Sequence, residues 1–241
     1  LNRVAFLGDR GSYSYLATQK YFSRRPGDLL ELGCQSFREV VGKVENNEAD
    51  YAVLPVENTT SGSINEVYDQ LQNTELSIIG ELTHAIKHSL LVAKETTLAN
   101  IKTLYAHPQV FTQCSHFLAE LGNVEVKTMD ATSSAMLKVS ELNRDDVAAI
   151  GSEAGGNLYG LFAIKSNLAN QKENHSRFIV VAKQPVVVPL QVPAKTTFVM
   201  STVQKPGALV EALMVLKENN INMTKLESRP IPGNPWEELF Y

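Results

Sequence analysis

The sequence has few cysteines and no long apolar segment. Its two cysteines, Cys34 and Cys114, are too few for a disulfide framework. Cys114 falls on an apolar helical face, which favours a buried thiol. No stretch approaches the roughly 18 apolar residues of a membrane span, and no signal peptide is visible. We therefore expect a cytoplasmic protein that has no membrane partner.

Clusters of basic residues are missing too. The 241 residues carry a formal net charge of −4 without a long run of lysine and arginine, so nucleic acid is not an expected partner. Hydrophobic residues make up 44% of the chain and charged residues 20%, which is typical of a folded globular protein. This length fits one large domain or two smaller ones.

Several catalytic motifs are absent as well. The chain has no Cys/His cluster at metal-binding spacing, no glycine-rich nucleotide loop and no Ser-x-Gly nucleophile elbow. Gly8-Asp9-Arg10-Gly11 follows an apolar segment but lacks the dinucleotide fingerprint. We therefore expect neither a metal nor a cofactor.

What the chain does contain is a repeated unit of strand, polar loop and helix. Strands that lead into polar loops are expected at residues 4–8, 51–56, 103–106, 124–129 and 147–151. One helix shows its period plainly, with Ser36 as N-cap and an apolar face formed by Phe37, Val40, Val41 and Val44. This alternation predicts parallel α/β architecture, in which ligands bind beyond the carboxyl ends of the strands.

A long extended passage near residues 79–93 separates these units into two groups. We expect one lobe at 1–78 together with 172–183, a second lobe at 79–171, and a cleft between them. The strand at 174–182 would cross back to the first lobe.

This returning strand has side chains that alternate between its two faces. Alternation places Ser176 and Phe178 on one face and Arg177 on the other. The polar residues at its start either cap the strand or form the point at which the polar loops converge. Ser176 is our candidate for that point.

After residue 183 the composition changes. Pro185, Pro189 and Pro193 recur every four residues, which forbids a regular helix and indicates a linker at 184–195. A second unit follows, with a strand at 196–201, a helix opened by Pro206-Gly207-Ala208, a strand at 221–228, a turn at 229–235 and a strand at 236–241. This unit is too small for a good core. We expect it to be truncated, completed by another chain, or both.

Neutral hydrogen-bond donors gather in the loops after the strands. They are Ser12, Ser14, Asn58, Thr59, Thr60, Ser61, Thr132, Ser133, Ser134 and Ser152. Each one alone is explained as a helix cap, but capping does not account for five such loops. Hydroxyls and backbone N–H groups suit a multiply anionic organic ligand. His107, before Pro108, is either a base or a loop histidine held by the backbone.

Taken together, these loops resemble the prephenate dehydratase family over residues 3–183. The motifs are Gly11-Ser12-Tyr13-Ser14, Pro55-Val56-Glu57-Asn58-Thr59, His107-Pro108-Gln109, Thr132-Ser133-Ser134-Ala135, Gly151-Ser152-Glu153-Ala154 and Ser176-Arg177-Phe178. Two further motifs, Gly207-Ala208-Leu209-Val210 and Glu227-Ser228-Arg229-Pro230, resemble the phenylalanine-effector motifs of the family's ACT domain. The similarity extends to bifunctional members of the family, whose chorismate mutase helices would precede Leu1.

The resemblance implies a fold and an activity. The fold is a two-lobed, periplasmic-binding-protein-II-like α/β domain at 1–183, followed by a truncated, ferredoxin-like ACT domain at 196–241. The activity is the decarboxylating dehydration of prephenate to phenylpyruvate, with feedback inhibition by L-phenylalanine. The implied assembly is a homodimer or homotetramer.

The resemblance also assigns residues. Ser176 stands where the family usually has an essential threonine; it keeps the hydroxyl but lacks the methyl that restricts χ1. We expect Ser176 to donate to the departing hydroxyl, with Glu57 or Asp130 as alternative acids. The substrate-binding candidates are Ser12, Asn58, Thr59, Thr132, Ser133, Ser134, Ser152, Arg177 and Phe178. Arg177, on the opposite face, is either a charge partner for the substrate or part of a structural ion pair.

Two other classes of protein share some of these features. A solute-binding protein would have the two lobes but would be secreted and would lack residues 206–241. An amino-acid sensor would have the second unit without needing the donor-rich loops.

Overall fold

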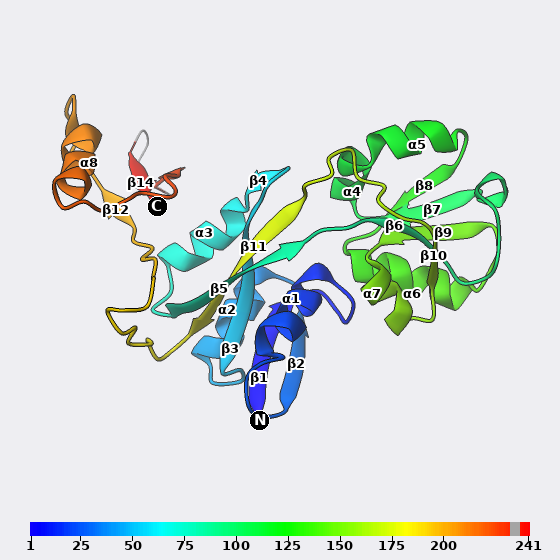
Figure 1. Cartoon of the computed structure of the whole chain (residues 1–241), viewed down its shortest axis with the longest axis horizontal. Coiled ribbons are helices and arrows are strands. Elements are labelled where there is room, and N and C mark those ends of the chain that lie inside the picture. Colours follow the sequence, from blue (N-terminus) through cyan, green and yellow to red (C-terminus); the bar gives the residue numbers. More distant parts are fainter. Residues whose placement is uncertain (232–236) are drawn as a thin grey trace. The chain divides into compact units, whose positions relative to one another are not determined.

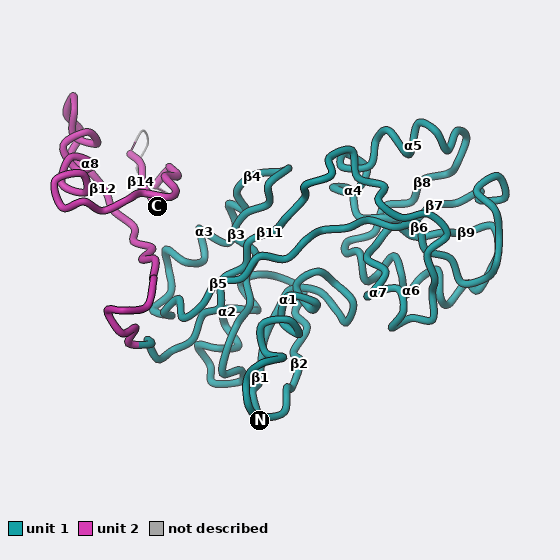
Figure 2. The backbone as a smooth tube through the Cα atoms, viewed as in Figure 1, with its two compact units in different colours: residues 1–186 teal, residues 187–241 magenta. Residues whose placement is uncertain are grey.

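The computed structural model describes residues 1–231 and 237–241 (Figure 1). The part of the expected turn and final strand that falls on 232–236 lies outside the described residues. The chain divides into two compact units, Leu1–Val186 and Val187–Tyr241 (Figure 2). The division falls inside the segment expected to be a linker.

Both ends of the larger unit contribute to its first sheet. The strand order is β2-β1-β3-β11-β5, with the short β4 paired to β3. The bounds are β1 (Asn2–Leu7), β2 (Leu29–Cys34), β3 (Tyr51–Asn58), β4 (Gly62–Ser63), β5 (Ser77–Ala85) and β11 (His175–Ala182). β1, β2 and β3 run parallel, whereas β11 is antiparallel to both of its neighbours. The expected parallel architecture is therefore mixed in this sheet, because β11 returns from the second lobe and begins beside the end of β3.

Three helices accompany the first sheet: α1 (Tyr13–Phe22), α2 (Phe37–Glu45) and α3 (Asn65–Gln72). The predicted cap of α2 is confirmed, since Oγ of Ser36 accepts from the backbone N–H of Glu39 at 3.2 Å. Between α1 and the sheet lies an apolar cluster that includes Phe6, Tyr15 and Phe178. Burial of these aromatic side chains fixes α1 against the strands. We call this sheet and its helices the first lobe.

The second sheet has the strand order β10-β6-β9-β7-β8. The bounds are β6 (Ser89–Val92), β7 (Thr103–Ala106), β8 (Glu125–Thr128), β9 (Val147–Gly151) and β10 (Phe162–Lys165). The helices are η1 (Leu98–Asn100), α4 (Pro108–Gln113), α5 (Ser115–Leu121), α6 (Thr132–Leu142) and α7 (Glu153–Leu158). The one helix expected around Cys114 is two, because Cys114 has the non-helical dihedrals φ −120° and ψ 24°. We call this sheet and its helices the second lobe.

The chain crosses between the two lobes twice (Figure 1). The outgoing segment, 86–88, joins β5 to β6, and the returning segment, 166–174, joins β10 to β11. The two segments are bonded together, since Ile86 N donates to Asn174 O at 2.8 Å and Leu168 N to His88 O at 3.0 Å. The lobe boundary expected at 78 comes too early, because β5 stays paired to β11 as far as Ala85.

The smaller unit is a three-stranded antiparallel sheet in the order β12-β14-β13, with one helix. Its elements are β12 (Met200–Ser201), α8 (Ala208–Glu218), β13 (Ser228–Pro230) and β14 (Glu238–Phe240). The order of strand, helix, strand and strand is the expected one, but β12 is much shorter than the sequence indicates. The strand expected at 221–228 is absent from 221–227, and β13 instead extends into the turn expected from residue 229. Within the described part of the chain, no helix has both the length and the apolar character needed to cross a membrane.

Candidate active site

Ser176 lies in the middle of a row of side chains that spans three strands. It is in register with Asn58 on β3 and with His84 on β5. Residues directly opposed in antiparallel strands point to the same face, so the three side chains share one surface. Nδ2 of Asn58 donates to Oγ of Ser176 at 3.0 Å. Both residues are buried, which keeps water away from this bond.

The orientation of the Asn58 amide is determined by the backbone. Its Oδ1 accepts from the N–H groups of Thr60 at 2.9 Å and Ser61 at 3.0 Å. Backbone N–H groups only donate, so the oxygen end must face them and the NH2 end must face Ser176. Ser176 therefore accepts from Asn58 and keeps its own hydrogen. Among the residues that the structure describes, that hydrogen has no acceptor, so it is available to a ligand.

The N-terminus of α1 brings the second lobe close to this row. The Tyr13 ring lies 6.3 Å from that of His84. A Cβ placed on Gly155, in α7, would lie 2.4 Å from the carbonyl oxygen of Gly11. Such a contact is impossible for a real side chain, so the two lobes approach this closely only because residue 155 is glycine.

Ser12, Ser152 and Ser133 sit at the N-termini of α1, α7 and α6. Oγ of Ser12 accepts from Tyr15 N at 3.2 Å and that of Ser152 from Gly155 N at 3.0 Å, so both are helix caps. Ser133 differs: it is 1% exposed, and its Oγ has no hydrogen-bond partner in the described part of the chain. Ala131, which precedes α6, cannot cap it with a side chain.

The start of α6 therefore combines an uncapped helix N-terminus with a buried free hydroxyl. Thr132 and Ser134 flank Ser133 in the same turn. A buried hydroxyl without a partner is costly unless a ligand completes it. The partial positive charge of the helix N-terminus favours an anion there.

Further bonds order the residues around the cleft, and the one from Gln109 crosses between the lobes. Thr59 exchanges two bonds with His175, accepting from its N–H and donating its own N–H to the carbonyl, both at 2.9 Å. Nε2 of Gln109, in α4, donates to Oγ of Ser61 across the cleft at 2.7 Å. Nδ1 of His107 accepts from Gln109 N at 3.2 Å, and burial lowers the pKa of His107. Of the two readings of His107, the structure favours the histidine held by the backbone.

Glu57 and Arg177 lie away from the Ser176 surface, whereas Phe178 shares the face of Ser176 but is covered by α1. Glu57 and Arg177 oppose each other on the other face of β3 and β11, with 2.6 Å between Oε2 and Nη2. Arg177 also lies 3.5 Å from Glu81. Arg177 is therefore part of an ion-pair group. Phe178 is 1% exposed and packs in the core beneath α1, which makes it a packing residue.

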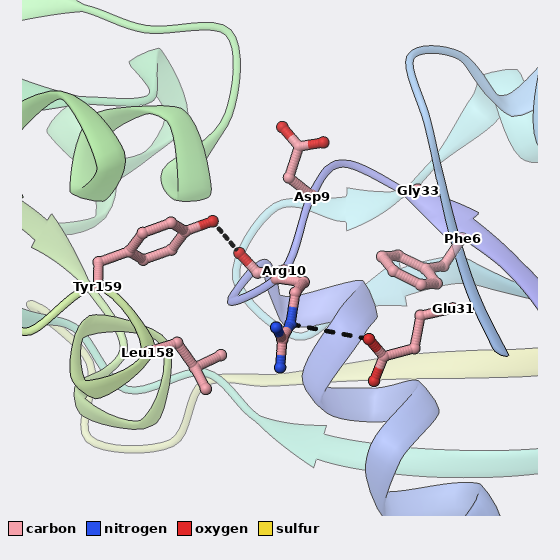
Figure 3. A pocket seen from close by; sticks show the side chains of 7 residues that line it. All are labelled: Phe6, Asp9, Arg10, Glu31, Gly33, Leu158 and Tyr159. Carbon is pink, nitrogen blue, oxygen red and sulfur yellow. Dashed lines mark hydrogen bonds and ion pairs between the residues drawn. The ribbon is translucent and has the colours of Figure 1, made fainter. Parts of the chain in front are cut away.

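A charged depression of about 420 Å³ lies beside the start of α1 (Figure 3). Its lining residues are Phe6, Asp9, Arg10, Glu31, Gly33, Leu158 and Tyr159. Arg10 lies 3.7 Å from Glu31, and the Tyr159 hydroxyl donates to the Arg10 carbonyl, which ties the end of α7 to the first lobe. The depression is charged, whereas the surface around Ser176 carries neutral donors. Across the described residues, no group of His, Cys, Asp and Glu side chains is arranged to hold a metal ion.

Comparison with known proteins decides between the candidate classes. The family model described as prephenate dehydratase matches residues 4–186. The chain belongs to the prephenate dehydratase family. The predicted resemblance is confirmed over the larger unit.

Individual relatives agree with the prephenate dehydratase assignment. A bifunctional chorismate mutase/prephenate dehydratase of Enterobacter agglomerans is 55% identical over 239 residues, which cover 99% of this chain and 62% of that protein. The chain thus spans about three fifths of that relative. A solved prephenate dehydratase of Arthrobacter aurescens in complex with L-Phe has a TM-score of 0.80 at 25% identity, covering 99% of this chain and 78% of that one. A structure described as a novel type of quorum quenching acylase has a TM-score of 0.83 at 30% identity, covering 99% and 85%.

Three buried polar residues of this prephenate dehydratase family member were missed by the sequence reasoning. They are His88, Gln113 and Asn174, which are 2%, 7% and 3% exposed. Asn174 and His88 lie in the two crossing segments, and Gln113 ends α4. The signal that could have found them is an amide or imidazole beside apolar residues, as in His88 directly before the apolar β6.

Proposed function

We propose that this chain catalyses the decarboxylating dehydration of prephenate to phenylpyruvate. The observation that carries the proposal is the bond from Asn58 Nδ2 to Oγ of Ser176, which leaves the Ser176 hydrogen free on a buried surface between two lobes. Membership of the prephenate dehydratase family supports the choice of substrate. The finer fold assignment belongs to the same proposal: a periplasmic-binding-protein-II-like pair of lobes, followed by part of an ACT domain.

The substrate carries two carboxylates and a ring hydroxyl that departs. The start of α6, with Ser133 flanked by Thr132 and Ser134, binds the carboxylate that is retained. Neutral donors suit the other carboxylate, because a cation held against it would stabilise the ground state and oppose its loss as CO2. Arg177 does not fill this role, since it is committed to Glu57 on the opposite face.

Ser176 acts on the leaving group. The bond to the departing carboxylate breaks and its electron pair enters the ring, which releases CO2. The electron pair of the ring C–O bond leaves with the oxygen, which takes up a proton and becomes water. Aromatisation drives the reaction. The departing oxygen needs a hydrogen bond or a proton, and such assistance is typically worth about 3–5 kcal/mol. A serine hydroxyl is a weak acid, so Ser176 stabilises the departing oxygen as a hydrogen-bond donor. Asn58 assists because it already fills one lone pair of Oγ.

The Ser176→Ala variant tests this role. We expect kcat to fall about 10²-fold or more with little change in KM, because the bond strengthens in the transition state. Phenylpyruvate absorbance measures the rate. Ser176→Thr is the matched control, since it keeps the hydroxyl and should retain activity. Near wild-type turnover in Ser176→Ala would remove the assignment.

The similarity to an acylase raises acyl transfer as a second activity, but the site does not favour it. A serine nucleophile needs a base within hydrogen-bond reach. Oγ of Ser176 accepts from the Asn58 amide, and no histidine nitrogen bonds to that oxygen in the described residues. Assaying the same preparation with an N-acyl amide separates the two reactions.

The smaller unit supports an effector role. A depression of about 340 Å³ there is lined by Thr202, Val203, Gln204, Lys205, Gly207, Ala208, Leu209, Val210, Glu238 and Phe240. The first predicted effector motif, Gly207 to Val210, lines it, whereas Glu227, Ser228, Arg229 and Pro230 do not.

We propose that L-phenylalanine binds in this depression and inhibits the reaction, and that the protein is a homodimer or homotetramer. Calorimetric titration with L-phenylalanine tests it; binding should be lost in Leu209→Lys, and D-phenylalanine is the control.

A further inference from the structure

A chain of buried amides connects Ser176 to the segments that join the lobes. Nδ2 of Asn58 also donates to Oδ1 of Asn174 at 2.7 Å. Nδ2 of Asn174 donates to Oε1 of Gln113 at 3.3 Å, and Oε1 of Gln113 lies 2.7 Å from Nε2 of His88. The chain thus passes from the first lobe, through the returning segment, to the second lobe, and ends in the outgoing segment.

The direction of every bond in this chain follows from its first member. The Asn58 oxygen faces two backbone N–H groups, and its NH2 group also lies 3.2 Å from the carbonyl oxygen of His175, so this amide has one possible orientation. Asn174 must then accept from Asn58 and donate onward. Gln113 must present its oxygen to Asn174, and the same oxygen faces His88.

Only one tautomer of His88 fits the last hydrogen bond of the chain, the one with Gln113. Because Gln113 offers an oxygen at 2.7 Å, Nε2 of His88 must carry the hydrogen. Nδ1 is then the acceptor nitrogen, 3.1 Å from the Tyr13 hydroxyl. That hydroxyl has one hydrogen, which it donates to the Lys87 carbonyl at 2.7 Å and shares with Nδ1. Burial lowers the pKa of His88 and raises that of Tyr13, which agrees with a neutral ring beside a protonated phenol.

The hydrogen-bond chain restrains the Asn58 amide, which donates to Ser176. The Asn58 NH2 group makes its shortest bond to Asn174, which holds one of its two hydrogens. The other hydrogen is directed at Ser176 and shared with the carbonyl oxygen of His175. Asn174 is held in turn by Gln113, and Gln113 by His88. The backbone fixes which end of the Asn58 amide faces Ser176. A displacement at either crossing segment would therefore tilt this amide without turning it over, and would change the direction in which the Ser176 hydroxyl donates.

We propose that His88, as its Nε2–H tautomer, is a positioning residue that holds Gln113 and Asn174 and thereby aims the Ser176 hydroxyl. Its effect on catalysis rests on the proposed dehydratase function. The tautomer itself rests only on the hydrogen-bond chain. An experiment can therefore reject the tautomer and the effect on catalysis separately.

The first test reads the tautomer directly. Long-range ¹H–¹⁵N spectra of the full chain distinguish a protonated Nε2 from a protonated Nδ1, and the His88 signal is identified by its loss in His88→Gln. We expect Nε2–H in the wild-type protein. A protonated Nδ1 would overturn the proposal.

The second test reverses the direction of the hydrogen bonds between residue 174, Gln113 and His88. In Asn174→Asp, residue 174 offers only acceptors, so Gln113 must turn its NH2 group toward it and toward His88. The hydrogen of His88 should then move to Nδ1 and donate to the Tyr13 hydroxyl. An unchanged tautomer in a folded variant would contradict the hydrogen-bond chain on which the proposal rests.

The third test is kinetic. His88→Leu removes the donor to Gln113, and we expect kcat to fall about tenfold with KM changed by less than about threefold, the effect of one hydrogen bond. His88→Gln places an amide N–H near the position of Nε2 and should recover most of that loss. Equal losses in both variants would reject the positioning role. An inactive wild type with the expected tautomer would reject the dehydratase proposal while leaving the chain intact.

Discussion

The Asn58 side chain donates to Oγ of Ser176 at 3.0 Å, although the two residues are 118 positions apart in the chain. The bond joins adjacent strands, β3 and β11, at their shared edge of the cleft. It gives the serine one role, that of donor to whatever the cleft holds.

Reversing this bond should disable the site. In Asn58→Asp the side chain presents only oxygen, so the Ser176 hydrogen turns toward residue 58 and is no longer available to the leaving group. The added negative charge also repels a dianion. We expect kcat to fall by about 10²–10³-fold, comparable to the loss of one preorganised donor. Steady-state phenylpyruvate formation measures it. Asn143→Asp, which makes the same charge change on an exposed residue at the end of α6, should leave the rate unaltered.

Neutralising Glu57 should have a far smaller effect. Its carboxylate pairs with Arg177 on the face opposite Ser176. We expect Glu57→Gln to lower kcat less than about tenfold, because a partly exposed ion pair contributes little, and to leave the pH–rate profile in place. A shift of the pH–rate profile together with a larger loss of kcat would instead identify Glu57 as the general acid.

The contact of Gly155 with Gly11 should be required for activity. Gly155→Ala places a methyl 2.4 Å from the Gly11 carbonyl oxygen and 2.8 Å from Oγ of Ser152, so the lobes must separate. A displacement of about 1 Å can cost about 10²-fold, and we expect a loss of that order in kcat/KM. Gly42→Ala is the control, because nothing lies within 4 Å of the added carbon in α2, where alanine favours the helix. Equal activity in both variants would show that the close approach is not needed.

The ion pair of Arg3 and Asp50 should make folding stability depend on pH. The hydrogen bond from the Arg3 guanidinium lowers the pKa of Asp50 below its usual value. The stabilisation is therefore present above the unfolded-state pKa of about 4, and it is lost as pH falls through the lower folded-state value. Both side chains are partly exposed, so we expect only about 0.2–1 kcal/mol. Thermal unfolding of wild type and Asp50→Asn should differ at neutral pH and converge in acid; a constant difference would contradict this.

Several features of the site were predictable because they are local. Ser36 was expected as a cap from the apolar period that follows it, and it caps α2. Alternation along one strand separated Ser176 from Arg177, and the structure places Arg177 in an ion pair on the other face. The strands β2 and β10 were missed, since Glu31 and Gly33 interrupt the apolar pattern of β2 and β10 is only four residues long.

The sequence by itself determined which residues face the same way, where the helices begin and which loops carry hydroxyls, because these follow from the periods of strand and helix over a few neighbouring residues. Only the tertiary structure decided which amide faces Ser176, that Ser133 has no partner among the described residues, and that His88, Gln113 and Asn174 complete the hydrogen-bond chain. Those relationships join residues far apart in sequence, and the direction of each hydrogen bond is fixed only when all of its partners are in place.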